Sequence, residues 1–275
     1  MTYQGSEPRD AATGRLTGTA VLFDIDDTLV DLVLAMGRTL REIPDPALSR
    51  LSDADWIRYI ELYTADPRRH YERFLLGEVT FQEQRVHRIR HARAEFTDEP
   101  FSGAVVDTWV SAYEQTLPRH FAMFDDVGPL LDELDALGVP YGAVSNNVHA
   151  YQRAKLDRAG LERIEVLVGI DTVGVAKPDP AIYLEGVRLL GADPARTVYV
   201  GDNRELDAVG ATNAGLIGVW LDRSDNRSDE ALADSFDTGQ GLSSGPDGGQ
   251  EVDAAEPVPT ISGLAAVLQF LPSVR

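Results

Sequence analysis

Residues 20–31, which read AVLFDIDDTLVD, place two carboxylates directly after a short apolar run. The run Ala20–Phe23 does not alternate with polar residues, which is typical of a strand buried on both faces. Asp24 ends this run and Asp26 follows two residues later, so both side chains point to the same side if the segment stays extended. Two neighbouring carboxylates repel each other unless a proton or a cation relieves them. The spacing therefore predicts a metal site, and oxygen ligands favour Mg²⁺; the alternative is an ordinary acidic turn after a strand.

Four further apolar runs, with helical patterns between them, predict an α/β core. The predicted strands are Tyr141–Val144, Val166–Gly169, Thr197–Val200 and Leu216–Leu221, and the predicted helices are Asp125–Leu137, Ala150–Ala159, Pro180–Leu190 and Glu205–Ala214. A short edge segment and a closing helix are expected within Thr260–Phe270. Strands that alternate with helices imply right-handed crossovers and a mostly parallel sheet. Such sheets bind ligands at the carboxyl ends of their strands, which is where Asp24 lies.

Between the first predicted strand and the rest of the core, the sequence pattern is helical. The predicted helices of this block are Leu32–Glu42, Asp53–Tyr63, Arg68–Leu76, Phe81–Glu95 and Val105–Gln115, separated by proline and glycine. Asp53 and Thr80 are the expected N-caps, and Thr80 is expected to form a capping box with Glu83. We therefore expect residues 32–121 to form a helical cap domain, inserted into a core of residues 19–31 and 122–275.

Two segments have a composition that predicts disorder. Residues 1–18 are polar and read as a tail. Residues 222–259 hold ten acidic and two basic residues and few large apolar ones, which predicts an acidic disordered insertion within the core.

Composition and charge limit the partners that we expect. The 275 residues include 25 Lys and Arg against 45 Asp and Glu, so the net charge is −20. This acidity argues against binding to nucleic acid or to anionic membranes, because both are polyanions. It also favours a halophilic source, since high salt screens self-repulsion; an ordinary acidic protein is the alternative. There is no cysteine and no apolar core of a signal peptide, so we expect a cytoplasmic protein without thiol chemistry.

Polar groups also lie at the ends of the later predicted elements. Ser145 and Asn146 follow the strand Tyr141–Val144, where a hydroxyl and backbone amides can bind phosphoryl oxygens, although Ser-Asn-Asn is also ordinary turn chemistry. Lys177 lies in the sequence KPDP just before a predicted helix. A cation held there can neutralise a phosphoryl group, and the alternative is a surface lysine.

A second pair of carboxylates lies at the end of a later strand. Asp202 follows the strand Thr197–Val200, and Asp207 lies in the first turn of the next predicted helix. Both side chains can therefore face one cation, while an N-cap followed by a first-turn acid is the alternative.

These four stretches, in this order, resemble the four motifs of the haloacid dehalogenase (HAD) superfamily, whose members are mostly phosphatases. Asp24-Ile25-Asp26-Asp27-Thr28 resembles the first motif, Ser145 the second, Lys177-Pro178-Asp179-Pro180 the third, and Gly201-Asp202 with Asp207 the fourth. The resemblance covers residues 20–31 and 124–221. It implies a Rossmann-like parallel sheet with a helical insertion of the C1 cap type, as in phosphoglycolate phosphatase-like members.

The resemblance also implies a role for each motif residue. Asp24 would be the nucleophile that forms an aspartyl-phosphate, and Asp26 the general acid and base, oriented by Thr28. The expected Mg²⁺ ligands are the carboxylates of Asp24, Asp202 and Asp207, the last directly or through water, and the backbone carbonyl of Asp26. The residues expected to hold the phosphoryl oxygens are Ser145, Asn146 and Lys177.

We therefore expect a Mg²⁺-dependent phosphatase that acts on a small phosphorylated metabolite as a monomer or homodimer. The dehalogenases of the superfamily lack the second aspartate, because halide leaves without a proton, so Asp26 argues for phosphate chemistry. A phosphomutase would keep all four motifs and remains an alternative. A non-catalytic phosphate-binding regulatory protein would be expected to have lost Asp24 or Asp26.

The predicted cap concentrates cations, which makes it the expected source of substrate selection. They are Arg68, Arg69, His70, Arg73, Arg85, His87, Arg88, Arg90, His91 and Arg93. The simpler interpretation is that these side chains lie on solvated helix faces, paired with Glu72, Glu83 and Glu95. The functional alternative is that Arg85, the first cation after the turn at residues 77–81, binds a second anionic group of the substrate.

Overall fold

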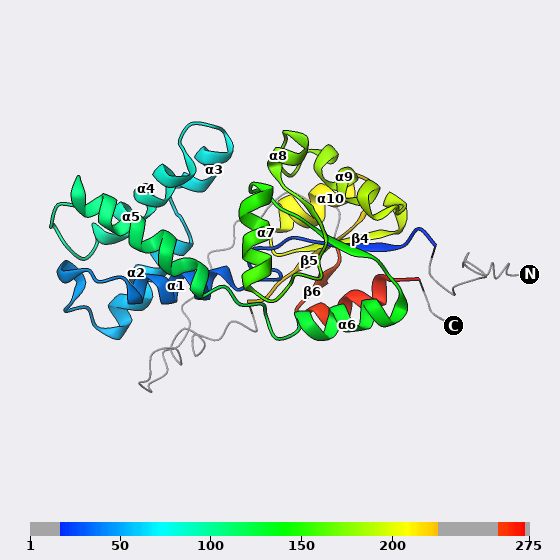
Figure 1. The fold of residues 1–275 in the computed structure, drawn as a ribbon, viewed down its shortest axis with the longest axis horizontal. Coiled ribbons are helices and arrows are strands. Elements are labelled where there is room, and N and C mark those ends of the chain that lie inside the picture. The colour runs from blue at the N-terminus through cyan, green and yellow to red at the C-terminus, as the bar shows by residue number, and fades with distance from the viewer. Residues whose placement is uncertain (1–16, 225–257, 273–275) are drawn as a thin grey trace, which may run out of the picture. The chain divides into compact units, whose positions relative to one another are not determined.

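The computed structural model describes residues 17–224 and 258–272, and their contacts divide them into two compact units (Figure 1). The described residues of the first unit, which we call the core unit, are 17–31, 123–224 and 258–272. The second, which we call the helical unit, holds residues 32–122. Apart from a few residues at their edges, the predicted tail of residues 1–18 and the predicted insertion of residues 222–259 lie outside the described residues.

Among the described residues, the core unit forms a six-stranded parallel sheet in the order β3-β2-β1-β4-β5-β6. The strands are β1 (Ala20–Phe23), β2 (Tyr141–Val144), β3 (Val166–Val168), β4 (Thr197–Gly201), β5 (Ile217–Leu221) and β6 (Thr260–Ile261). Every residue of β1 is buried, and β1 lies between β2 and β4 in the middle of the sheet. The predicted α/β class with a parallel sheet is confirmed.

The register of the three central strands brings distant parts of the chain to one edge of the sheet. Phe23 of β1 pairs with Ala143 of β2 and with Val200 of β4. Each of these strands ends within one residue of this level. The polar residues that follow the strands therefore meet at their carboxyl ends, where open parallel sheets bind ligands.

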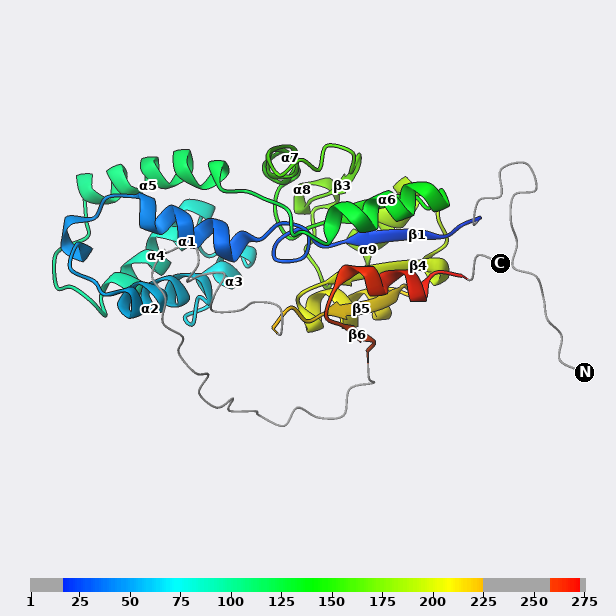
Figure 2. The ribbon, with the colours of Figure 1, turned by 90° about the horizontal axis from the view of Figure 1, so that it is seen from below.

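Helices cover both faces of this sheet. They are α6 (Val127–Leu137), α7 (His149–Arg158), α8 (Ile170–Val173), α9 (Pro180–Leu190) and α10 (Gly210–Asn213), with the short helical turns η3 (Pro194–Arg196), η4 (Arg204–Val209) and η5 (Leu264–Phe270). Figure 1 shows α9 and α10 on one side of the sheet and α6 with η5 on the other, and Figure 2 shows α6 and η5 side by side. Ile182 of α9 forms one buried cluster with Leu22 of β1, Val144 of β2 and Tyr199 of β4.

Two helical segments of the core differ from their prediction, and a third was not predicted. The predicted helix Glu205–Ala214 is a π-helical turn, η4, that continues into α10. Widened turns of this kind are frequent at functional sites, and Asp207 lies within this one. The predicted closing helix is the 3₁₀ helix η5, and the four residues of α8 are too few to show helical periodicity in the sequence.

Helices form the regular structure of the helical unit. They are α1 (Leu32–Glu42), η1 (Pro46–Leu48), α2 (Asp53–Thr64), α3 (His70–Leu75), α4 (Phe81–Arg93), α5 (Ala104–Thr116) and η2 (Leu117–Arg119). The predicted capping box of Thr80 and Glu83 is confirmed, but α2 is capped by Ser52 and not by Asp53, because the Ser52 hydroxyl accepts a backbone hydrogen bond from the first turn. Helix α3 starts two residues later than predicted, since Arg69 has a left-handed φ of 56°. Of the helices in the described residues of either unit, none combines the length and apolarity needed to cross a bilayer.

Candidate active site

The loop after β1 holds Asp24 in a buried position at the edge of the sheet. Its amide donates a hydrogen bond to the carbonyl of Val200 in β4 (2.8 Å), and only 6% of the residue is exposed. The carbonyl of Ile25 accepts hydrogen bonds from the amides of both Leu29 and Val30 (2.9 Å each), which closes the loop into a tight turn. Asp24 is therefore fixed by a strand on one side and a closed turn on the other.

Thr28 ties this loop to the loop after β4. Its hydroxyl accepts a hydrogen bond from the amide of Asp202 (3.0 Å). This partner differs from the predicted one, because the sequence resemblance implies that Thr28 orients Asp26. In the structure Thr28 fixes the loop that carries Asp202, and the carboxylate of Asp26 is held by other residues.

Three carboxylates from different parts of the chain converge beside β1. Single oxygens of Asp24, Asp202 and Asp207 all lie within 4.8 Å of one another, with Asp24 and Asp207 buried and Asp202 exposed. Such a group of hard oxygen donors suits Mg²⁺. The side chain of Asp26 is not part of this group, which is compatible with the prediction that only its backbone carbonyl binds the metal.

A buried lysine bridges two of these carboxylates. The Nζ atom of Lys177 lies 2.6 Å from Oδ1 of Asp24, 2.7 Å from Oδ1 of Asp207 and 3.1 Å from the hydroxyl of Tyr199. Burial lowers the pKa of Lys177, but Asp207 and Asp24 outweigh it and hold this pKa well above its ordinary value. The ammonium group is therefore charged, and with three ionised carboxylates the site would carry two net negative charges, which one divalent cation would neutralise.

The electrostatics of Asp24 agree with this charge balance. Burial raises the pKa of Asp24, the nearby Lys177 lowers it, and the carboxylates of Asp207 and Asp26 raise it again, with a result of about 7. Without a bound cation, the ionised form of Asp24 is thus costly despite the lysine.

The position of Asp207 depends on its neighbours in the turn η4. The amide of Asn203 donates to Oδ2 of Asp207 (2.9 Å), and the backbone of Gly201 packs against the same carboxyl group. A Cβ atom added at Gly201 would overlap the carboxyl carbon of Asp207. The glycine at the end of β4 is therefore required for Asp207 to approach the strand.

Ser145 and Asn146 lie at the end of β2, as predicted, but their contacts differ. Asn146 uses both ends of its amide on the backbone of Lys177: Oδ1 accepts from the amide nitrogen (2.6 Å) and Nδ2 donates to the carbonyl oxygen (3.1 Å). The side chain of Asn146 thus positions Lys177. Its predicted contact with a phosphoryl oxygen stays a prediction. The hydroxyl of Ser145 accepts a hydrogen bond from Nε2 of Gln152 in α7 (2.6 Å).

Sequence reasoning missed three buried polar residues of the site: Gln152, Lys155 and Tyr199. Gln152 and Lys155 reach Asp26 from α7, and Tyr199 in β4 contacts Lys177 and donates to the carbonyl of Val144 (3.1 Å). A signal is present in the sequence, because Gln152, Lys155 and the apolar Leu156 share one helix face. Two polar residues on the face that a helix buries need a partner, but the spacing does not say which.

The cations of the helical unit divide into exposed and buried ones. Arg69 and Glu72 form an exposed ion pair, as the simpler interpretation expects, and Glu95 pairs with Arg58, which is not one of the cations considered there. Arg85, in contrast, is only 9% exposed.

The buried arginines of helix α4 pack inside the helical unit. The guanidinium of Arg85 lies over the rings of Phe81 (4.2 Å) and Tyr113 (5.3 Å). Nε of Arg88 donates to the carbonyl of Tyr63 at the end of α2 (2.8 Å), and Arg93 forms a buried ion pair with Asp45. These arginines are therefore not on solvated helix faces.

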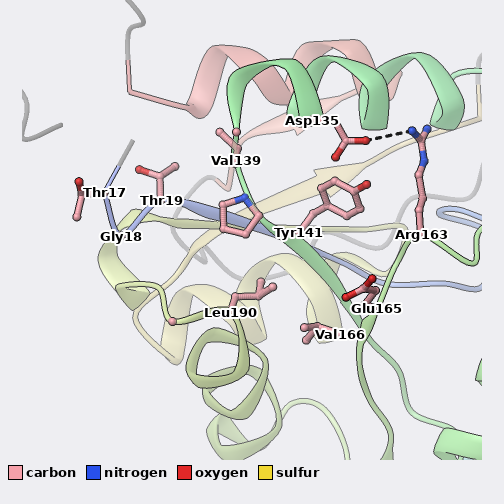
Figure 3. Close-up of a pocket in the computed structure, with 13 residues that line it drawn as sticks. Thr17, Gly18, Thr19, Asp135, Val139, Tyr141, Arg163, Glu165, Val166 and Leu190 are labelled. Carbon is pink, nitrogen blue, oxygen red and sulfur yellow. Dashed lines mark hydrogen bonds and ion pairs between the residues drawn. The ribbon is translucent and has the colours of Figure 1, made fainter. Parts of the chain in front are cut away.

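A pocket lies at the opposite ends of the strands (Figure 3). It is lined by residues at the amino ends of β1, β2 and β3, among them Thr19, Tyr141 and Glu165. Arg163 on its wall is paired with Asp132 and Asp135. Because the motif residues follow the carboxyl ends of the strands, this pocket contains none of them and is separate from the candidate site.

Comparisons with known proteins show what the chain resembles. Residues 19–215 match the model of the haloacid dehalogenase-like hydrolase family. The glyceraldehyde 3-phosphate phosphatase of Methanopyrus kandleri is 31% identical over 215 residues, which are 74% of this chain and 84% of that protein. The ribulose-1,5-bisphosphate 5-phosphatase of Halopiger xanaduensis is 28% identical over 220 residues, which are 78% and 90% of the two chains. The structure of L-2-haloacid dehalogenase from Xanthobacter autotrophicus with chloropropionic acid covalently bound has a TM-score of 0.62 at 22% identity; it covers 91% of this chain and 97% of that one, a likeness of fold alone.

Proposed function

Because this chain belongs to the haloacid dehalogenase-like hydrolase family, we propose that it is a phosphatase that hydrolyses a small phosphorylated metabolite. The observation that supports this most is the convergence of Asp24, Lys177 and the acids Asp202 and Asp207, from three stretches of the chain, at one edge of the sheet. The relatives named as phosphatases support the same reaction class.

The reaction follows from the charges at this edge. A carboxylate oxygen of Asp24 attacks the phosphorus, and the bond to the ester oxygen breaks with its electron pair left on that oxygen. Asp26 donates a proton to the leaving oxygen and later takes one from the water that attacks the phosphorus. In that second step the bond between phosphorus and Asp24 breaks, which releases inorganic phosphate and restores the carboxylate. Lys177 and Ser145 bind the phosphoryl oxygens and offset their charge.

The carboxylates of Asp24, Asp202 and Asp207 and the backbone carbonyl of Asp26 would hold Mg²⁺. When bound, the cation supplies charge neutralisation for the phosphoryl oxygens. Two features of the site support this fit. The donor atoms are oxygens, and the three carboxylates with Lys177 carry two net negative charges when all are ionised.

Asp26 favours phosphate chemistry over dehalogenation. A leaving alkoxide needs a proton, whereas a leaving halide does not, and the superfamily's dehalogenases lack this second aspartate. In this chain Asp26 is present and two side chains of α7 hold its carboxylate. The similarity of fold to a dehalogenase therefore does not extend to the acid that the phosphatase reaction needs.

Release of phosphate from p-nitrophenyl phosphate with Mg²⁺ tests this proposal, followed by glyceraldehyde 3-phosphate and ribulose 1,5-bisphosphate. We expect turnover that excess chelator abolishes and added Mg²⁺ restores. Asp24→Asn should lose at least about a hundredfold in rate. Asp27→Asn is the matched control: it is the same change in the same loop, and Asn tolerates the φ of 60° at that position. A folded protein that releases phosphate from none of these esters would contradict the proposal.

We also propose that residues 32–121 are the C1 cap that selects the substrate. Residues 32–121 hold 12 of the chain's 25 Lys and Arg but also 14 Asp and Glu, a net charge of 12 − 14 = −2, so a second anionic group of the substrate would have to be recognised by individual arginines and not by the charge of the whole segment. Exchange of this segment for that of a related phosphatase should change the preferred substrate and leave the hydrolysis of p-nitrophenyl phosphate within a few-fold. An unchanged order of preference would contradict the assignment.

A further inference from the structure

Two buried polar side chains of helix α7, Gln152 and Lys155, contact residues that take part in the proposed reaction. Lys155 is only 1% exposed, and its Nζ atom contacts Oδ1 of Asp26. Gln152 is completely buried, and its Nε2 atom lies 3.1 Å from Oδ2 of Asp26 and 2.6 Å from the hydroxyl of Ser145. One helix thus contacts both oxygens of the Asp26 carboxylate and, through the same amide, the Ser145 hydroxyl.

This arrangement is costly as a purely structural device. Burial of an ammonium group costs several kcal/mol unless it is paired and hydrogen-bonded. The ion-pair partner of Lys155 is Asp26, a half-buried residue in the loop after β1, and the two are 129 positions apart in the chain. Leu156, the next residue of α7, is completely buried and shows that an apolar side chain can fill this face.

The carbonyl oxygen of the Gln152 side chain gives a second reason to think that this amide is present for the contacts of its nitrogen. Its Oε1 atom is buried and accepts no hydrogen bond from the described part of the chain. A buried acceptor without a partner costs about 1–3 kcal/mol, so a leucine of similar size would fill the same space at lower cost. The amide of Gln152 is therefore explained by what its Nε2 atom holds together.

We propose that Gln152 and Lys155 are positioning residues that hold Asp26 and Ser145 at a fixed spacing for protonation of the leaving group. Lys155 and Gln152 orient the carboxylate of Asp26, and Gln152 couples it to the hydroxyl that binds a phosphoryl oxygen. The inference rests on the proposed function, because it concerns the general acid of that reaction. Both residues act through Asp26 and Ser145 and do not touch the reacting phosphorus.

This role predicts a dependence on the leaving group. General acid catalysis matters for alkyl phosphates, whose alkoxide leaves poorly, and matters little for p-nitrophenyl phosphate, whose phenolate leaves readily. The value of kcat/KM reports the steps up to cleavage of the ester bond, so it isolates the protonation step from the later attack of water. We expect Lys155→Met and Gln152→Leu to lose about a hundredfold in kcat/KM for an alkyl phosphate such as glycerol 3-phosphate, and at most a few-fold for p-nitrophenyl phosphate.

Two comparisons separate positioning from simple loosening of the helix. Leu156→Ala removes a completely buried apolar side chain of the same helix, and it should affect both substrates equally. In an Asp26→Asn background, Lys155→Met should cause little further loss, because residues that act through one another are not additive. Binding of Mg²⁺, followed by the fluorescence of Trp220, whose Nε1 donates to the carbonyl of Asp202 (2.9 Å), should survive in each variant.

The outcomes distinguish this inference from the function that it rests on. If the wild-type protein hydrolyses no phosphate ester, the proposed function fails and the inference with it. If the wild type is active but Lys155→Met and Gln152→Leu lose equal factors on both substrates, or lose further activity in the Asp26→Asn background, only the inference is overturned. If Lys155→Met does not fold, Gln152→Leu decides the question, because it removes a poorly satisfied amide and keeps the ion pair.

Discussion

At the scale of single residues, the carboxyl of Asp24 combines a chemical role with an electrostatic cost. Burial first, and the carboxylates of Asp207 and Asp26 after it, raise its pKa from 3.8 to about 7, although Lys177 acts in the opposite direction. A carboxyl group with a raised pKa binds its proton more tightly in the folded protein than in the unfolded one. The loss of folding stability caused by ionisation of Asp24 is therefore absent below about pH 4, grows between pH 4 and 7, and is complete above pH 7.

The substitution Asp24→Asn should accordingly stabilise the metal-free protein, and more so at high pH. We expect a gain on the order of 1–4 kcal/mol at pH 8 and a clearly smaller one at pH 5, because the wild-type group is largely protonated at pH 5. Thermal unfolding in excess chelator, followed by circular dichroism at the two pH values, measures the difference. A gain in stability of equal size at both pH values would contradict the assignment to the ionisation of Asp24. Saturating Mg²⁺ should reduce the stability difference between the variant and the wild type at pH 8.

At the scale of elements, the turn η4 and the end of β4 act as one unit. Gly201 has no side chain where Asp207 packs, and the backbone N–H of Asn203 donates a hydrogen bond to the same carboxylate. The loop after β1 joins them, since Thr28 accepts the hydrogen bond from Asp202. The geometry of the proposed Mg²⁺ site thus depends on close backbone packing between elements.

A methyl group at the end of β4 should therefore disturb the proposed metal site. Gly201→Ala places a Cβ atom into the carboxyl group of Asp207, so we expect at least about a tenfold rise in the Kd for Mg²⁺. Gly128→Ala in α6 is the matched control, because its nearest neighbour would lie at an ordinary 3.8 Å and a helical alanine is favourable. Isothermal titration of Mg²⁺ into both variants measures the effect, and equal affinities would show that Asp207 does not need this packing.

Helix α4 of the helical unit sets a second test at this scale. Arg85→Ala removes a guanidinium that packs on two aromatic rings and should cost about 1–3 kcal/mol of unfolding free energy, whereas Arg90→Ala on the exposed face of α4 should cost little. If Arg85 also binds a second anionic group, KM for glyceraldehyde 3-phosphate should rise about tenfold, with p-nitrophenyl phosphate unaffected. Equal effects on both substrates would leave Arg85 with its packing role alone.

At the scale of the whole molecule, the dominant feature is the net charge of −20. Self-repulsion of this size opposes the compact state, and salt screens it over a distance of about 8 Å at physiological ionic strength. Exposed ion pairs such as Arg58 with Glu95 contribute little in comparison, typically below about 1 kcal/mol each.

The melting temperature should therefore rise with potassium chloride. Between about 0.1 and 2 M we expect an increase of several degrees, because screening relieves repulsion more than it weakens the exposed ion pairs. Chloride is the appropriate anion, since sulfate stabilises proteins by exclusion from their surface. A melting temperature that stays constant or falls over this range would contradict the idea that the acidity is an adaptation to high salt.

Local patterns along the chain were enough to predict the parallel sheet and the polar residues at its carboxyl edge. The run Ala20–Phe23 is apolar throughout because β1 is buried on both faces, and the carboxylate that ends it must lie at the edge. Strand–helix alternation then placed Ser145 and Asp202 at the same edge, since parallel strands all end on one side. Local patterns were weaker at helix starts, because Ser52 caps α2 in place of Asp53 and the left-handed Arg69 moves the start of α3 by two residues.

The partners of the side chains were decided only by the tertiary structure. Lys155 meets Asp26, and the amide of Asn146 meets the backbone of Lys177, across 129 and 31 positions of the chain. Periodicity shows that a helix such as α7 buries one face, but the loop that this face meets depends on how the helix packs against the sheet. A buried ammonium or amide is stable only where that packing supplies a partner, so these contacts are properties of the assembled core unit and not of any single stretch of sequence.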